Sequence, residues 1–107
     1  MPKGVLVVQS APVDPAHEVE FERWYRDEHL PDICAIPGFT GARRFKVVRQ
    51  RSGAPVAEYL AVYELDSDDL EATVAEMSAR SADGRVRRST TVQTEPPPVV
   101  ALYELID

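Results

Sequence analysis

The residues best suited to chemistry gather between positions 21 and 31. This segment holds the only tryptophan, Trp24, and one of the two histidines, His29. Read as a helix, it places Phe21, Tyr25 and Glu28 at spacings of four and three residues, so they share one face with Trp24. An imidazole titrates near neutral pH and can take a proton from an enol, a phenol or an activated methylene group. The segment therefore predicts an acid/base site on an aromatic helix face.

Each of these residues also has an ordinary structural interpretation. His29 would be hydrogen-bonded at the negative end of its helix, and Trp24 and Tyr25 would belong to the core. Neighbouring residues on a helix point about 100° apart, so Glu28 is not a natural partner for His29. Glu28 would instead form an ion pair with an arginine of the sheet, such as Arg44. The sequence leaves both interpretations open.

Arginines and tyrosines on the predicted strands supply further candidates. Arg43 and Arg44 are adjacent on a strand, so one side chain faces the helices and the other faces away. The inward arginine could hold a carboxylate or an enolate, or it could form an ion pair with the acidic first helix. Tyr59, Tyr63 and Tyr103 could supply hydroxyl groups to a pocket, or could simply satisfy local acceptors.

Residue counts argue against a metal or cofactor site. The chain has two histidines and one cysteine, without the spacings typical of metal ligands. It has no glycine-rich phosphate loop and no dinucleotide fingerprint. A haem would need an axial ligand, and His29 is the one suitable residue, which makes haem a minor alternative. We therefore expect no bound cofactor.

Length and charge restrict the class of protein. A chain of 107 residues predicts a single domain over residues 1–107. The net charge of -6 argues against nucleic acid or an anionic membrane as the main partner. The lone Cys34 excludes an intrachain disulfide and fits a reducing, cytoplasmic setting. The apolar run at residues 4–9 is too short for a signal peptide, and no segment is long enough to predict a transmembrane helix.

Hydrophobic patterns predict four strands and two helices. The first helix should break before Pro31, because the residue before a proline disfavours helical angles, and should add one turn to about residue 35. In the second strand we expect Phe39, Gly41, Arg43, Phe45 and Val47 to share one face. Residues 81–98 give little signal and predict a loop. The predicted elements are strand 4–9, helix 15–29, strand 39–51, strand 57–65, helix 67–80 and strand 99–106.

This order predicts an α+β fold of the ferredoxin-like type, β-α-β-β-α-β, with a four-stranded antiparallel sheet. Two helices can cover only one face of such a sheet. The strands at residues 5–8, 59–65 and 99–106 are nevertheless apolar on both faces. An uncovered apolar face of that size is unusual for a soluble monomer. We therefore expect a homodimer whose sheets meet face to face as an α+β barrel.

The chain resembles the dimeric α+β barrel superfamily, and its EthD-like branch in particular, through residues 18–46. The resemblance implies a pocket between the sheet and the helices of each subunit, where a histidine and nearby aromatic residues act on a small molecule. By position, His29 would be the acting residue, with Tyr25 and Trp24 lining the pocket. The motifs are Glu20-Phe21-x-x-Trp24-Tyr25-x-x-Glu28-His29-Leu30-Pro31, Pro37-Gly38-Phe39 and Ala42-Arg43-Arg44-Phe45.

These observations lead to a functional hypothesis. We expect a small cytoplasmic enzyme that acts on a ring-containing keto or hydroxy metabolite, polyketide-like or aromatic, as a cyclase or isomerase. His29 would be the general base, Tyr25 or Tyr63 would stabilise enolate charge, and Arg43 or Arg44 would anchor an anion. The alternatives are a cofactor-independent monooxygenase that uses the same site and a non-catalytic small-ligand binder. The residues expected to contact substrate are Phe21, Trp24, Glu28, Arg43, Arg44 and Tyr59.

Overall fold

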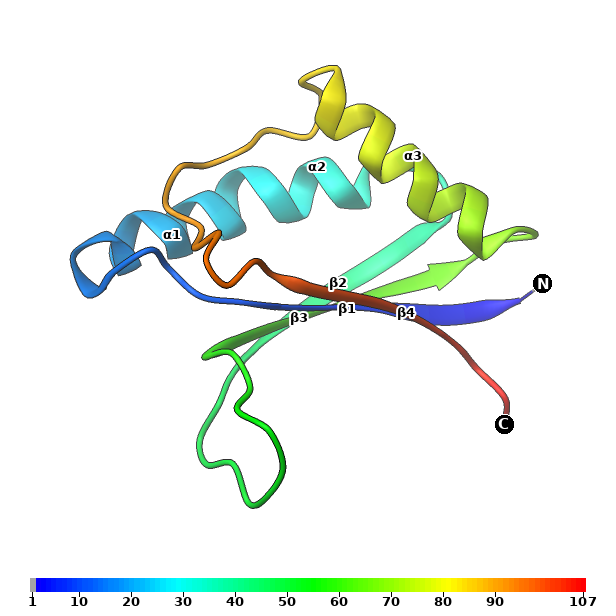
Figure 1. The fold of residues 1–107 in the computed structure, drawn as a ribbon. Coiled ribbons are helices and arrows are strands. Elements are labelled where there is room, and N and C mark those ends of the chain that lie inside the picture. The colour runs from blue at the N-terminus through cyan, green and yellow to red at the C-terminus, as the bar shows by residue number, and fades with distance from the viewer. Residues whose placement is uncertain (1) are drawn as a thin grey trace.

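The computed structural model describes residues 2–107. Its four strands form one antiparallel sheet in the order β2-β3-β1-β4, and the helices lie together above one face of it (Figure 1). The predicted α+β fold with this sheet is confirmed. The elements are β1 (Lys3–Ser10), η1 (Pro15–His17), α1 (Glu18–Trp24), η2 (Tyr25–His29), α2 (Leu30–Cys34), β2 (Phe39–Lys46), β3 (Tyr59–Asp66), α3 (Leu70–Ala82) and β4 (Val99–Glu104).

The core lies between the sheet and the helices. β3 alternates regularly, with Tyr59, Ala61, Tyr63 and Leu65 buried beneath the helices and the residues between them half-buried on the other face. Successive side chains of a strand point to opposite faces, so these four lie together on the side of the helices. The largest fully buried side chains come from both layers: Leu6, Phe21, Ile33, Ile36 and Tyr63.

The first helical segment differs from a simple helix followed by a break. It begins as a 3-10 turn capped by the Asp14 carboxylate, becomes α1, and then widens into the π-helical turn η2 before Pro31. In η2 the backbone N–H of Leu30 donates to the carbonyl of Tyr25, five residues back. Pro31 has no N–H, and in an α-helix its ring would meet the carbonyl of residue 27. The extra residue in the turn lets the chain stay helical through Cys34 instead of breaking at Leu30.

The second strand contains a β-bulge that overturns the expected facing of its residues. Phe39 pairs with Leu65, but Gly41 pairs with Glu64, so the intervening residue has no partner in the register. A bulge adds one residue to one strand and reverses the alternation beyond it. The prediction that Phe39 shares a face with Arg43 and Phe45 is therefore wrong. Phe39 is buried under the helices, whereas Phe45 lies exposed on the other face.

Several predicted boundaries were also wrong by a few residues. β2 ends at Lys46 rather than residue 51, and β4 ends at Glu104 rather than residue 106. α3 begins at Leu70 rather than residue 67, because the carboxylate of Asp69 accepts the N–H of Ala72 and caps the helix there. The predicted loop at 81–98 begins two residues later, because α3 continues to Ala82; residues 83–98 form a long connection with one isolated bridge between Pro12 and Val92.

The face of the sheet away from the helices, which we call the open face, is apolar. Phe45, Val47, Val99 and Tyr103 are all exposed on or beside it. Val7 and Val62 face each other at its centre across β1 and β3. The predicted homodimer would cover this face. Within residues 2–107, every helix is too short or too polar to cross a bilayer.

Gly38 offers a test of how the helices are joined to the sheet. It has a positive φ of 102°, and a Cβ there would lie 2.8 Å from the Thr73 side chain of α3. We expect Gly38→Ala to lower the free energy of unfolding by roughly 2–4 kcal/mol, from backbone strain plus overpacking. The measurement is chemical denaturation.

Gly84→Ala is the matched control. Gly84 also has a positive φ, of 89°, but open space surrounds its Cβ position. This substitution should cost only about 1 kcal/mol, the backbone part alone. Equal losses in the two variants would contradict the contact between Gly38 and α3.

Candidate functional site

A cavity of about 400 Å³ lies between the helices and the sheet, next to the segment of residues 21–31. Four of the predicted site residues line it: Trp24, Tyr25, His29 and Tyr63. The first three come from the α1–η2 segment, and Tyr63 rises from the centre of β3. Most of the remaining lining is apolar, which suits the body of a small organic molecule.

The π-helical turn sets the direction of His29. Its ring stacks on Trp24, five residues earlier, with centroids 4.4 Å apart and an interplanar angle of 26°. The Tyr25 ring meets it edge-on at 5.1 Å. In an α-helix the partner of Trp24 on this face would be residue 28. Because η2 contains one more residue per turn, His29 instead of Glu28 occupies the position next to Trp24, and Glu28 points away from it.

Burial keeps the His29 imidazole neutral. It lowers the pKa of His29 from 6.5 to about 4, against the opposing effect of the Asp32 carboxylate, and the nearby Arg44 adds to the lowering. The Nδ1 atom is buried with no hydrogen-bond partner in the described part of the chain. At neutral pH the ring can therefore accept a proton.

The two cavity tyrosines keep their protons. Burial raises the pKa of Tyr63 far above its ordinary value and also raises the pKa of Tyr25. The hydroxyl of Tyr25 lies 3.3 Å from the hydroxyl of Ser10. The hydroxyl of Tyr63 is buried and finds no partner among residues 2–107. An unsatisfied buried hydroxyl costs about 1–3 kcal/mol, so a ligand that accepts this hydrogen bond gains by it.

Arg44 faces the helices, and Arg43 lies on the open face. The guanidinium of Arg44 sits 4.2 Å from the centroid of the Tyr25 ring and donates to Glu22 at 2.5 Å. The guanidinium therefore packs against the ring of Tyr25, and Arg44 itself does not line the cavity. Arg43 pairs with Glu64 across the neighbouring strand. Neither arginine lies where the predicted anion anchor would have to be.

The other predicted contact residues also lie away from the cavity. Phe21 is fully buried in the core. The hydroxyl of Tyr59 donates to the Glu18 carboxylate at 2.6 Å. Glu28 accepts from Arg23 at 2.7 Å, so its expected pairing with Arg44 was wrong.

Residues of the 83–98 connection also close the cavity, and none of them was predicted to do so. Val86 and Arg88 both line it. The connection is fastened by Arg87, which binds the Asp32 carboxylate through its backbone N–H and its guanidinium at 2.9–3.0 Å. The indole N–H of Trp24 donates to the carbonyl of Arg87 at 3.2 Å. The run of arginines was visible in the sequence, but the partner residues lie more than fifty positions away.

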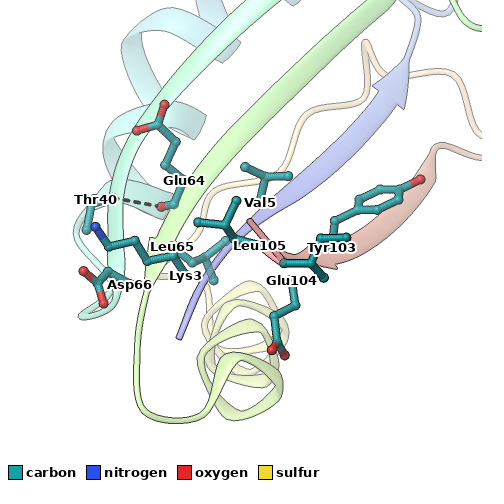
Figure 2. A pocket seen from close by; sticks show the side chains of 11 residues that line it. Lys3, Val5, Thr40, Glu64, Leu65, Asp66, Tyr103, Glu104 and Leu105 are labelled. Atoms are coloured by element: carbon teal, nitrogen blue, oxygen red, sulfur yellow. Dashed lines mark hydrogen bonds between the residues drawn. The ribbon is translucent and has the colours of Figure 1, made fainter. Parts of the chain in front are cut away.

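A larger hollow, of about 620 Å³, lies on the open face near the chain termini (Figure 2). It is bordered by strand ends, including Val5, Glu64, Tyr103 and Leu105. It contains no histidine, and its apolar part is continuous with the open face. Tyr103, expected as a possible pocket hydroxyl, therefore lies on the opposite side of the sheet from His29. We assign the candidate site to the smaller cavity.

The structure places no group of three or more potential metal-ligating side chains together within residues 2–107.

The buried imidazole predicts a specific dependence of stability on pH. The unfolded chain binds a proton at His29 below pH 6.5, whereas the folded chain does so only below about pH 4. The free energy of unfolding should therefore fall as the pH falls through this window, by up to about 3 kcal/mol for this residue.

Denaturation of the wild type and of His29→Gln at several pH values isolates this contribution. Carboxylates titrate in both proteins, so their contribution cancels in the comparison. The wild type should therefore lose more stability than the variant between pH 6.5 and 4. Parallel curves would show that the ring is open to water.

Solved structures share the fold of this chain. An EthD (ethyl tert-butyl ether D) family protein from Bacillus halodurans superposes with a TM-score of 0.61 at 16% identity, over 99% of this chain and 100% of that one. An EthD-like protein from Ralstonia eutropha gives 0.61 at 19% identity, over 100% and 95%. A candidate monooxygenase from Shewanella loihica gives 0.60 at 18% identity, over 100% and 98%. The predicted EthD-like fold is confirmed.

Sequence comparisons give the family. No curated protein matches the chain. The sequence model of a domain of unknown function, DUF4286, matches residues 8–83, which run from β1 to the end of α3. The chain therefore belongs to the DUF4286 family.

Proposed function

We propose that this protein is a small enzyme that needs no bound cofactor and acts by proton transfer on a ring-containing keto or hydroxy metabolite, polyketide-like or aromatic, as a cyclase or isomerase. One observation supports this most directly. A neutral, half-buried imidazole and a fully buried phenol, His29 and Tyr63, line the same cavity. Such a pair can remove a proton and stabilise the negative charge that results.

In this proposal His29 is the general base. Its low pKa makes it a weak base in the empty cavity, so it suits a substrate whose proton is already acidic, such as a 1,3-dicarbonyl compound or a phenol. Negative charge that develops beside the ring raises the pKa of the imidazole as it takes the proton. Stacking against Trp24 holds the ring in one orientation during the transfer.

Tyr63 is the proposed donor to the developing enolate oxygen. Its hydroxyl keeps its proton because burial raises its pKa, and the neighbouring Tyr25 phenol adds to that rise. A preorganised donor in a water-poor cavity stabilises an oxyanion more than water would. Tyr25, hydrogen-bonded to Ser10 and backed by Arg44, is the second proposed donor.

A second candidate reaction uses the same site for oxygen insertion. The similarity in fold to the candidate monooxygenase from Shewanella loihica favours it. Here His29 would deprotonate an electron-rich substrate, and the resulting carbanion would react directly with O2. The non-catalytic alternative is a small-ligand binder that uses the cavity without chemistry. No step in these proposals passes through a haem, for which His29 would have to be the axial ligand.

We also propose that the protein is a homodimer in which two open faces pack together and the helices stay outside. Exposed apolar side chains on that face, among them Phe45, Val99 and Tyr103, support this arrangement. Burying apolar surface of this kind favours assembly, because the hydrophobic gain offsets the freedom that two subunits lose when they associate. Each subunit would keep its own cavity beneath its helices.

Kinetic variants test the proton-transfer proposal. His29→Ala should lower kcat/KM by roughly 10²–10⁴-fold, the usual value of a positioned general base. Tyr63→Phe should lower it by about 10²–10³-fold, through loss of one oxyanion donor. Both should still bind the substrate, as followed by the fluorescence of the single tryptophan, Trp24.

The assay screens ring-containing keto and hydroxy compounds with and without O2. His17→Ala is the matched control, because His17 is exposed and pairs with Asp14 outside the cavity. Turnover that requires O2 would favour the oxygenase. Binding without turnover under either condition would favour the binder.

Disruption of the open face tests the dimer. Val62→Lys places a charge at the centre of that face and should convert a dimer to a monomer in sedimentation velocity experiments, because a buried unpaired charge is costly. Val48→Lys, at a position 99% exposed, should leave the assembly unchanged. A wild type that sediments as a monomer would contradict the proposal.

A further inference from the structure

We infer that the substrate is a ring-containing carboxylate whose acid group is held by Arg88 at the rim of the His29 cavity. This inference rests on the proposed function, because it names the class of molecule that the same cavity would take. It also replaces the predicted anion anchors Arg43 and Arg44, which the structure places elsewhere.

The charges around the cavity favour an anion. Arg88 is the one arginine or lysine in its lining, and none of the described residues that line it is an aspartate or a glutamate. This imbalance is local, because the whole chain has a net charge of -6. A cavity with one fixed cation and no carboxylate attracts a negative group and disfavours a positive one.

The guanidinium of Arg88 is available to a ligand. Its Nε donates to the hydroxyl of Ser81 at 3.2 Å, and no ion pair with a carboxylate forms within residues 2–107. Its neighbours differ: Arg80 binds Glu76 at 3.0 Å, and Arg85 binds Asp83 at 2.7 Å. The contact with Ser81 fixes one edge of the fork and leaves its terminal N–H groups free.

The backbone beside Arg88 is held in place on the cavity side. Val86 is 3% exposed, and Arg87 is fastened to Asp32 by three hydrogen bonds. The carbonyl of Arg87 accepts the indole N–H of Trp24, the residue on which His29 stacks. Arg88 therefore follows directly on a residue whose carbonyl binds Trp24, the side chain on which the proposed base stacks.

Carboxylate is the anion that fits this lining best. The planar guanidinium matches a carboxylate with two parallel hydrogen bonds. A phosphate with a double charge would call for further donors, and the lining has no second cation. The apolar groups Val8, Met77 and Val92 suit the ring itself, and a volume of about 400 Å³ holds a small one.

Binding of matched acids and esters tests the inference independently of turnover. The probes are benzoate, salicylate and 1-hydroxy-2-naphthoate with their methyl esters, followed by Trp24 fluorescence. The wild type should bind at least one acid about tenfold more tightly than its ester. Arg88→Gln should weaken binding of that acid by roughly 10–100-fold, the value of a charged hydrogen-bonded pair, and change ester binding less than about twofold.

Two further variants complete the design. Arg88→Lys keeps the charge without the fork and should give an intermediate loss for the acid. Arg85→Gln removes the same charge from the same segment, but from a side chain held by Asp83 outside the cavity lining, and should leave acid binding unchanged.

The inference is overturned if no acid binds, if the wild type does not prefer an acid to its ester, or if Arg85→Gln weakens acid binding as much as Arg88→Gln. Acid binding that depends on Arg88 but leads to no turnover would support the inference and contradict the proposed enzyme. Turnover of neutral substrates that is unaffected by Arg88→Gln would support the proposed enzyme and contradict the inference.

Discussion

The site depends on one departure from α-helical geometry, the π-helical turn between Tyr25 and His29. Pro31 cannot donate a backbone hydrogen bond, and its ring needs room near the preceding turn. The chain provides that room by taking up one extra residue, with the N–H of Leu30 bonded to the carbonyl of Tyr25. His29 consequently stacks on Trp24 inside the molecule, and Glu28 pairs with Arg23 at the surface. A regular helix would exchange these two residues and place a carboxylate where the imidazole now lies.

The fold could be predicted from the sequence because its strongest signals are local. The apolar runs that form β1 and β3 each depend on a few neighbouring residues. The facing of β2 could not be predicted, since the bulge at Thr40 is visible only from the register with β3. One extra residue in that strand decides which arginine lies beneath the helices. The prediction that Arg43 and Arg44 point in opposite directions was right, but only the structure shows which of the two faces the helices.

Only one wall of the cavity could be predicted from the sequence. His29, Tyr25 and Trp24 belong to one short segment, so their spacing indicated that they act together. Tyr63 was one of three strand tyrosines that could supply a hydroxyl group, and the structure shows that it lines the cavity whereas Tyr59 and Tyr103 do not. The opposite wall comes from the 83–98 connection, whose path is fixed by contacts with distant residues, such as Arg87 with Asp32 and Thr91 with Val13. Such pairings leave no periodic pattern in the sequence, and a run of arginines by itself is typical of a solvated surface.

The division of the cavity between two parts of the chain has an evolutionary consequence. The family model ends at residue 83, so the proposed base and phenols lie inside the shared portion and Arg88 lies beyond it. A connection without helix or strand tolerates replacement more readily than a packed core does. Relatives could therefore differ in this wall of the cavity while sharing the strands and helices that form the rest of it.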